Sequence, residues 1–490
     1  MEKPFDVVII GAGLGGLVSA NYLAKAGLRV LLLEQHSLPG GCCSSFERKS
    51  FIFESGAHSL GSCREDGLFS QIFEELDLHG SSGILVRRAV PSDSVITQDF
   101  TLSIRDTLSD NIEELSSIFP AERNRIKKFL NEIDGCDVRA TKSLLTYINR
   151  YQKITFRKML DEYFDDERLK QVFCVFLGNV GLPSTDVNAL RAIVMFREFI
   201  LDGGYYVVGG MHKLVDRLAS EFVSRGGTLR YQARVIGIHL DDHGVNGVSV
   251  STGEQYNTRV VISNTSPSQT FSSLLEDHTT QFGSEIDKYK SKIQGLLPSV
   301  SAVVIYLGLK RQLDEMGHGR TVWYMPAYDA DQVYADVLHG KPDLACRTFL
   351  AAFPARFDES LAPDGFECVN IFALAPFMDE QFWKHSKVKL TEALIKRAGN
   401  LIPNLQQRIV LQETATPITI QRYTLNDKGA MYGLASTMSQ MDAKVMPQKS
   451  IIPGLYFASH WSTIGTGQGG TPMAAFAGRN AARLALRALR

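Results

Sequence analysis

The sequence lacks the features that mark membrane spans, metal centres and nucleic-acid-binding surfaces. Its 490 residues contain no uninterrupted apolar run of about 18 residues, the length that a helix needs to cross a bilayer. The seven cysteines are odd in number and show no paired CxxC spacing, so we expect reduced thiols in a cytoplasmic setting and no metal site. The 52 basic residues are balanced by 53 acidic ones, which argues against a nucleic-acid partner. No basic leader precedes the first apolar run, so we expect no signal sequence.

The first 34 residues contain a dinucleotide-binding pattern. The apolar run Val7–Ile10 is followed by Gly11-Ala12-Gly13-Leu14-Gly15-Gly16 and, eighteen residues beyond Gly16, by Glu34. In such a pattern Gly11 permits the tight turn, Gly13 lets the backbone approach a pyrophosphate, and Gly16 lets the helix pack closely on the strand. A helix is predicted over 17–26 and a strand over 28–33, which would bring Glu34 to a ribose hydroxyl. An acid at this position disfavours a 2'-phosphate.

A second glycine pair follows in the segment Gly40-Gly41-Cys42-Cys43, with Gly56-Ala57-His58 after it. Glycines here suit a backbone that passes close to a ligand on the carboxyl edge of the sheet. The arrangement resembles the glycine-pair motif of the FAD-binding superfamily that includes amine oxidases and carotenoid desaturases, which implies FAD as the cofactor. Because cysteines stand where many of these enzymes have arginine, the segment looks like the retinol saturase branch of the phytoene desaturase and carotenoid isomerase family. Glu54 stands where that family usually has aspartate.

Two further blocks are similar to this family in their order along the chain. The first is the glycine-rich segment 203–211, followed by Val235, whose counterpart in the family presents its backbone to the adenine, and by Asn264 at the end of an apolar strand. The second is the glycine-rich turn 465–471 before Pro472, which fits the first turn of a terminal helix. The resemblance implies that FAD is bound by Gly11, Gly13, Leu14, Gly15, Gly16, Glu34, Gln35, Gly40, Gly41, Cys42, Cys43, Gly56, Ala57, His58, Val235, Asn264, Gly467, Gly470, Thr471 and Pro472.

The positions of these blocks imply an α/β protein with a discontinuous architecture. A Rossmann-like FAD-binding domain of the glutathione reductase type is expected from residues 1–85, 205–285 and 430–490. Residues 86–204 and 286–429 are expected to form the substrate-binding domain, with helices in the first stretch and a mixed sheet, including strands over 300–309 and 368–375, in the second. Apolar residues at helical spacing, such as Ile193, Phe196 and Ile200, indicate core packing or, as the alternative, the wall of an apolar tunnel.

The sequence shows no GxSxG, no HExxH and no cysteine and histidine cluster with metal-ligand spacing, so a flavin is expected to carry the reaction. His58 and His460 are the candidate catalytic residues, because each is predicted near the flavin at the end of a strand. A structural hydrogen bond is the alternative for each. Cys42 and Cys43 are interpreted as small side chains beside FAD, with reactive thiols as the alternative.

The resemblance implies an enzyme that acts on carbon-carbon double bonds of a polyene or isoprenoid lipid by saturation, desaturation or isomerisation. No second nucleotide fingerprint for NADPH is visible, so an external electron carrier, a quinone or oxygen is the expected redox partner. An amine-oxidase-like enzyme acting on carbon-nitrogen bonds is one alternative, and a non-catalytic lipid- or prenyl-binding protein with the same fold is another. One face of the terminal helix is either solvated or a peripheral membrane contact, and it carries Arg479, Arg483, Arg487 and Arg490.

Overall fold

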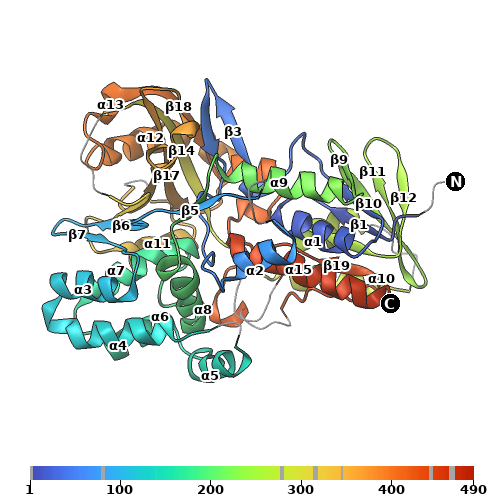
Figure 1. Cartoon of the computed structure of the whole chain (residues 1–490), viewed down its shortest axis with the longest axis horizontal. Helices are drawn as coiled ribbons and strands as arrows, with labels where there is room; N and C mark the ends of the chain where they lie inside the picture. The colour runs from blue at the N-terminus through green and yellow to red at the C-terminus, as the bar shows by residue number, and fades with distance from the viewer. Residues whose placement is uncertain are drawn as a thin grey trace.

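The computed structural model describes residues 4–78, 83–137, 140–275, 281–312, 318–343, 346–440, 445–462 and 470–490. Most of these residues belong to two β-sheets and the helices packed around them. Figure 1 shows a five-stranded sheet and its helices at one end of the molecule, where both termini lie, and a seven-stranded sheet with a cap of helices at the other end.

The five-stranded sheet is parallel throughout and is assembled from pieces far apart in the chain. Alternate residues of its central strand face opposite layers, with Val7 and Ile9 toward three helices and Val8 and Ile10 toward an antiparallel ribbon. Because both faces of this sheet are covered by other elements, its strands are continuous apolar runs. In spatial order the strands are β19 (Leu455–Phe457), β13 (Val261–Ser263), β1 (Val7–Ile10), β2 (Val30–Leu33) and β9 (Thr228–Arg230). The covering elements are α1 (Leu14–Lys25), α9 (Met211–Ser224), α15 (Thr471–Ala488), β10 (Val235–Asp241), β11 (Gly244–Val250) and β12 (Gln255–Asn257).

The first helix and second strand lie where the sequence predicts them, with shifted ends. Helix α1 begins at Leu14, three residues before the predicted start, because the chain turns directly from β1 into the helix with Gly13 as its N-cap. Strand β2 begins at Val30, two residues later than predicted. The tight turn therefore places the first helical N-H groups at the carboxyl edge of the sheet.

The seven-stranded sheet is antiparallel except where β15 pairs with β6. The predicted strands over 300–309 and 368–375 are β14 and β17, which pair over their full length, with Ser301 opposite Ala375 and Lys310 opposite Phe366. In spatial order the strands are β18 (Ile409–Ala415), β14 (Ser301–Lys310), β17 (Phe366–Ala375), β16 (Phe349–Ala352), β15 (Thr321–Tyr324), β6 (Asp93–Ile96) and β7 (Thr101–Ser103). Helices α12 (Glu380–Ala398) and α13 (Leu405–Arg408) pack against one face. The hairpin of β3 (Ser45–Arg48) and β4 (Phe51–Glu54) packs against part of the other.

A cap of helices covers the rest of that second face and shares a core with the sheet residues Trp323 and Leu350. The apolar residues Ile193, Phe196 and Ile200, at helical spacing in the sequence, lie buried in this core. They therefore pack the cap rather than line a tunnel. The cap consists of α3 (Leu108–Ile118), α4 (Arg123–Asp134), α5 (Thr141–Tyr151), α6 (Phe156–Tyr163), α7 (Glu167–Val175), α8 (Ala189–Met195), the π-helix η4 (Phe196–Leu201) and α11 (Ala330–Leu338).

The remaining elements connect these layers. Strand β5 (Val86–Arg88) pairs with β8 (Tyr205–Val207), and α2 (Leu68–Glu75), α10 (Gly283–Gln294) and α14 (Pro417–Thr424) complete the fold. None of the described helices has the length and apolar character that crossing a bilayer requires. The described residues also contain no group of three or more histidine, cysteine or acidic side chains arranged to hold a metal ion.

Candidate functional site

A large cavity lies where the two sheets and the helical cap meet. Its volume is about 1260 Å³, and its wall runs from the glycine turn after β1 to side chains of the helical cap and the seven-stranded sheet. Pockets for one small molecule usually measure about 300–1,000 Å³. The cavity therefore has room for an extended dinucleotide together with a second molecule.

The glycine turn forms one end of this cavity. A Cβ atom on Gly15 would lie 1.9 Å from the carbonyl oxygen of Ala458, and one on Gly13 would lie 2.7 Å from Asn264 Nδ2. Gly16 does not line the cavity, because it faces Gly11, whose carbonyl oxygen would lie 2.1 Å from an added Cβ. The turn thus has the two kinds of glycine that the spacing predicts, some facing the cavity and one packing the helix on the strand.

Glu34 ties the end of β2 to this turn. Its buried carboxylate accepts hydrogen bonds from the backbone N-H of Ala12 at 2.7 Å and of His36 at 2.9 Å. A carboxylate has about four lone-pair positions, so each oxygen can accept a further bond from a hydroxyl in the cavity. Gln35 and Val235 lie on the same part of the wall.

The second glycine pair lies directly against the first turn. Gly40 donates its backbone N-H to the Ala12 carbonyl at 2.8 Å, and a Cβ on Gly41 would lie 3.4 Å from Gly13 Cα. The carbonyl of Cys42 accepts a hydrogen bond from the backbone N-H of Ala57 at 2.9 Å, which holds the segment beginning at Gly56 beside the cavity. Burial raises the pKa of the Cys42 and Cys43 thiols. Both therefore stay protonated, which is the opposite of the reactive-thiol alternative.

The start of α15 supplies a second helix N-terminus to the same cavity. Gly470 is its N-cap with φ of +76°, and neither this cap nor Gly13 at α1 comes with a side-chain hydrogen bond to the first turn. Thr471 Oγ1 is buried and has no hydrogen-bond partner among the described residues. Pro472 occupies the first turn as predicted, and Gly467 lies outside the described residues.

These features fit a bound FAD. Two helix N-termini without side-chain caps suit its phosphate groups, the Glu34 carboxylate suits a ribose hydroxyl, and the close backbone contacts at the glycines leave the cavity open where side chains would fill it. The Thr471 hydroxyl, which has no partner among the described residues, adds a polar group to the cavity wall.

His58 lies on the cavity wall with its ring stacked on that of Phe372, the centroids being 5.2 Å apart. Burial, and secondly the nearby charge of Arg320, lower the pKa of His58 to about 4. Arg320 also donates a hydrogen bond to the His58 carbonyl oxygen. The imidazole is therefore neutral at pH 7 and keeps one donor and one acceptor nitrogen.

His460 lines the cavity just after β19, a strand of the parallel sheet. Its Nε2 atom is buried and has no hydrogen-bond partner among the described residues. Burial lowers the pKa of His460 to about 4. This imidazole is also neutral at pH 7, so its unpartnered nitrogen is available to a ligand.

A buried ion pair between Arg320 and Glu54 is linked to the backbone of His58. Arg320 Nη2 lies 3.3 Å from Glu54 Oε2, and both side chains are at most 2% exposed. The ring of Tyr206 lies under the guanidinium at 5.2 Å. Burial raises the pKa of Glu54 to about 7, against the opposing effect of Arg320. No local sequence pattern identifies Arg320 as a residue of the site, because its hydrogen-bond partners Glu54 and His58 lie more than 250 residues away in the sequence.

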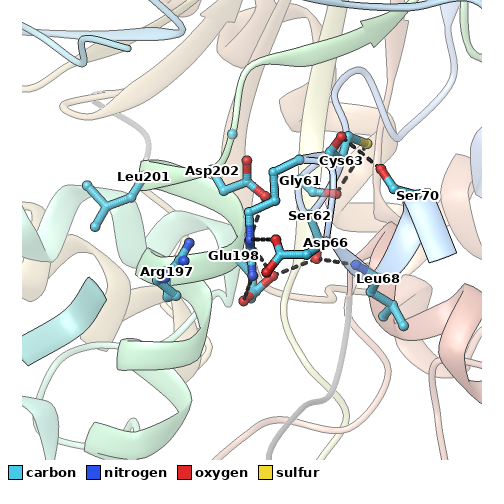
Figure 2. A network of polar contacts seen from close by, with 12 residues as sticks. Gly61, Ser62, Cys63, Asp66, Leu68, Ser70, Arg197, Glu198, Leu201 and Asp202 are labelled. Carbon is cyan, nitrogen blue, oxygen red and sulfur yellow. Dashed lines mark hydrogen bonds and ion pairs between the residues drawn. The ribbon is translucent and has the colours of Figure 1, made fainter. Parts of the chain in front are cut away.

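A second polar network fixes the loop after His58 to the helical cap, and Figure 2 shows it from close by. Arg64 Nη2 lies 2.9 Å from Glu198 Oε1, and Arg64 Nη1 lies 2.7 Å from Asp202 Oδ2. The hydroxyl of Ser62 donates to Glu198 at 2.5 Å. A Cβ on Gly61 would lie 2.2 Å from the Glu198 carbonyl oxygen, so the loop and the π-helix are in direct contact.

One face of α8 and η4 lines the part of the cavity next to the helical cap. Arg191, Val194, Met195 and Glu198 all contact it, and their spacing of three, four and seven residues places them on one face. The apolar residues at helical spacing in the sequence indicate only the opposite face, where Ile193 and Phe196 lie in the core. The mixed polarity of the cavity face gives no clear apolar periodicity, because Arg191 and Glu198 alternate with the apolar residues Val194, Met195 and Phe199.

Comparisons with known proteins agree with this arrangement. A model of the family described as flavin containing amine oxidoreductase matches residues 14–486. The prolycopene isomerase of Daucus carota chloroplasts is 24% identical over 488 residues, which cover 93% of this chain and 76% of that protein. The 4,4'-diaponeurosporene oxygenase of Staphylococcus aureus is 23% identical over 499 residues, which cover 97% of each.

Solved structures share the fold at low sequence identity. A putrescine oxidase variant superposes with a TM-score of 0.69 at 16% identity and covers 99% of both chains. An oxidoreductase from Methanosarcina mazei has a TM-score of 0.68 at 18% identity, covering 96% of this chain and 98% of its own. The fold is thus an FAD-binding α/β fold, and FAD is the cofactor that the family and these neighbours indicate. The chain belongs to the flavin containing amine oxidoreductase family.

Proposed function

We propose that this protein is an FAD-dependent oxidoreductase that acts on carbon-carbon double bonds of a polyene or isoprenoid lipid. The observation that carries the proposal is the cavity, which joins the glycine turns to a wall of apolar side chains from the cap and the seven-stranded sheet. That wall includes Val194, Met195, Trp323, Leu350, Phe372 and Leu374. Relatives named for prolycopene and diaponeurosporene support a lipophilic polyene as the substrate.

We assign the flavin contacts to the residues that the sequence marks. The first glycine turn and the start of α15 would hold the phosphates and ribityl chain, Glu34 a ribose hydroxyl, and Val235 the adenine. The domain division expected from the sequence, with a glutathione-reductase-type FAD domain, remains part of the proposal. Its support is the parallel sheet, whose strands come only from the three segments assigned to that domain.

When bound, the flavin would accept or donate the hydrogen equivalents of the reaction. The chain's own residues would position the polyene and exclude water from it. The neutral imidazoles of His58 and His460 are placed to hold a ligand or to move a proton, the second through its unpartnered Nε2 atom. The two electrons would pass to or from an external carrier, a quinone or oxygen.

An amine oxidase is the second candidate, because the fold is shared with putrescine oxidase. The cavity argues against it. Each described acid on its wall already has a partner: Glu34 binds two backbone N-H groups, Glu198 pairs with Arg64, and Glu413 lies 3.9 Å from Arg48. Glu198 and Glu413 thus face arginines and Glu34 is assigned to a ribose hydroxyl, so the described acids leave no free carboxylate beside the apolar wall for a cationic amine. A lipid-binding protein without catalysis is a third candidate, since Rab GDI from Plasmodium falciparum shares the fold with a TM-score of 0.56.

Extraction of the purified protein tests these candidates. The proposal predicts a yellow protein with releasable FAD and an organic extract that contains polyene or isoprenoid lipid. A coloured protein that carries no lipid and oxidises amines would favour the second candidate. Lipid without any flavin would favour the third.

Peripheral membrane contact through α15 is a separate part of the proposal. The structure reduces the number of arginines that could make this contact. Arg479 and Arg483 lie 3.4 and 3.6 Å from Glu75, and the Arg479 side chain is only 12% exposed. Arg483 is 46% exposed beside Glu75, so the exposed cations of this face that do not lie beside Glu75 are Arg487 and Arg490. Pelleting with anionic liposomes should weaken with salt and on removal of the last dozen residues, and pelleting unaffected by both would contradict the idea.

A further inference from the structure

Helix α5 separates the cavity from solvent on one side of the helical cap. Leu144 and Ile148, four residues apart on one face of this helix, line the cavity. The adjoining face carries Lys142, Leu145 and Asn149 at spacings of three and four residues, and all three are exposed, Leu145 to 53%. The cavity wall is therefore one helix thick at this place. Figure 1 shows α5 at the lower edge of the molecule, below the other cap helices.

The chain around α5 is strongly basic. Residues 140–160 contain five basic side chains and no acidic one, although basic and acidic residues balance over the whole sequence. Arg150 pairs with Glu132, and Arg157 pairs with Asp161. The other three are exposed and have no ion-pair partner in the part of the chain that the structure describes, and they are Lys142, Lys153 and Lys158. Such a segment attracts an anionic surface.

The exposed leucine indicates which kind of anionic surface fits. An apolar side chain among unpaired lysines is typical of a helix that lies in the headgroup layer of a bilayer. There the lysine ammonium groups can reach phosphates while their methylene stems stay beside apolar atoms. A nucleic acid or an acidic protein could pair with the lysines as well, but neither accounts for a basic helix whose other face lines an apolar cavity.

We propose that α5 docks on an anionic lipid bilayer, with Leu145 among the headgroups and Lys142 at their phosphates. The polyene would move from the bilayer into the cavity along Leu144 and Ile148. The inference rests on the proposed function and names the partner that supplies its substrate. The lipid would pass only the thickness of one helix, about 10 Å, between the bilayer and the cavity.

Sedimentation with vesicles tests the docking of the full-length, FAD-loaded protein. The two vesicle types are phosphatidylcholine alone and phosphatidylcholine mixed with phosphatidylserine. We expect binding to the anionic vesicles to be at least about fivefold stronger, since each lysine near such a surface contributes roughly that factor, and to weaken as salt screens the charges. Equal binding to both vesicle types, or binding to neither, would overturn the proposal.

Two substitutions of exposed apolar residues assign the contact to α5. Leu145→Glu places an acid on the docking face and should weaken binding to anionic vesicles at least about tenfold. The control is Val388→Glu, because Val388 is 62% exposed on α12, which packs on the other face of the seven-stranded sheet. The control should bind as the wild type does. Wild-type binding by Leu145→Glu, or an equal loss in both variants, would contradict the role of α5.

A charge reversal separates α5 from the arginine face of α15. Lys142→Glu should weaken binding to anionic vesicles at least about fivefold, and Leu145→Glu should weaken whatever binding remains in a protein without its last dozen residues. If this truncation abolishes binding while Lys142→Glu leaves it unchanged, the membrane contact belongs to α15 alone and the proposal is wrong.

Tryptophan fluorescence tests the passage of the polyene, because Trp323 lines the cavity and retinol absorbs tryptophan emission. Retinol supplied in anionic vesicles should quench the wild type at least about fivefold faster than Leu145→Glu, in line with the loss of docking. Retinol supplied in detergent micelles should quench both equally. Equal rates from vesicles would show that the polyene does not enter along α5. Uptake from micelles without vesicle binding overturns the docking alone, whereas no uptake from either source contradicts the proposed function itself.

Discussion

Arg320 lies 3.3 Å from Glu54 in an ion pair that is almost completely excluded from solvent. The pair joins the seven-stranded sheet to the hairpin of β3 and β4, and Arg320 also binds the backbone of His58. One buried guanidinium thus links the substrate-side sheet to the segment that follows the second glycine pair.

Loss of this guanidinium should destabilise the protein strongly. Arg320→Met leaves the Glu54 carboxyl buried without its cation, which typically costs about 3–5 kcal/mol of unfolding free energy. Chemical denaturation of the variant measures this cost. The control is Arg123→Met, whose ion pair with Glu113 is more than half exposed on both sides and should contribute at most about 1 kcal/mol. Similar losses in the two variants would contradict the structural role of Arg320.

The two cavity histidines should make stability depend on pH in a defined direction. Their pKa values in the folded protein are about 4, below the ordinary value of 6.5, so between about pH 6.5 and 4 these two histidines bind more protons in the unfolded chain than in the folded one. Their contribution to the unfolding free energy therefore falls as pH falls through this window, whereas Glu54, with its pKa raised to about 7, contributes in the opposite direction. His460→Asn should reduce the slope, whereas His385→Asn, at an exposed site, should not. Equal slopes in wild type and His460→Asn would show that His460 is not buried as described.

A single methyl group at Gly15 should disrupt the first turn. The Cβ of Gly15→Ala would lie 1.9 Å from the carbonyl oxygen of Ala458, which requires the backbone of β19 or α1 to move. The variant should lose most of its bound FAD, measured as the ratio of visible to ultraviolet absorbance. Gly295→Ala is the control, since its Cβ would lie 3.5 Å from the nearest atom and φ at this residue is −80°. Full FAD retention by Gly15→Ala would place the cofactor elsewhere.

Removal of Arg64 should change which ligands the cavity accepts. Arg64→Met frees the Glu198 carboxylate from its ion pair, so that an uncompensated acid faces the apolar wall. Polyene affinity should fall and a cationic alkylamine should bind more tightly than to the wild type, both measurable by fluorescence titration. The double variant Arg64→Met with Glu198→Gln should lose the gain for amines. No change in amine binding in the single variant would show that Glu198 does not reach the ligand.

The residues that the sequence assigns to FAD come together around one cavity because their motifs are made of local backbone features. The turn at Gly11 to Gly16, the pair at Gly40 and Gly41 and the start of α15 at Pro472 each depend on short segments whose residue types encode the geometry. Residues assigned to FAD from these motifs line one cavity, apart from Gly16, which packs the helix, and Gly467, outside the described residues.

The substrate half could not be predicted in the same way. Arg320 and Glu54 are 266 residues apart in the sequence, and Arg64 and Glu198 are 134 residues apart. No local sequence pattern therefore predicts either ion pair. The apolar stripe at Ile193 and Phe196 is real but faces the core. The cavity face of the same helix, with Arg191 and Glu198, is mixed in polarity and follows only from the tertiary packing.

The most direct test of the proposed function is anaerobic incubation of the FAD protein, in its oxidised and its reduced form, with polyenes and with amines. Flavin absorbance follows the redox state while chromatography identifies the products. The proposed function predicts a saturated, desaturated or isomerised polyene in at least one redox form, and no flavin reduction by amines. Rapid flavin reduction by an amine, with every polyene recovered unchanged in both redox forms, would contradict it.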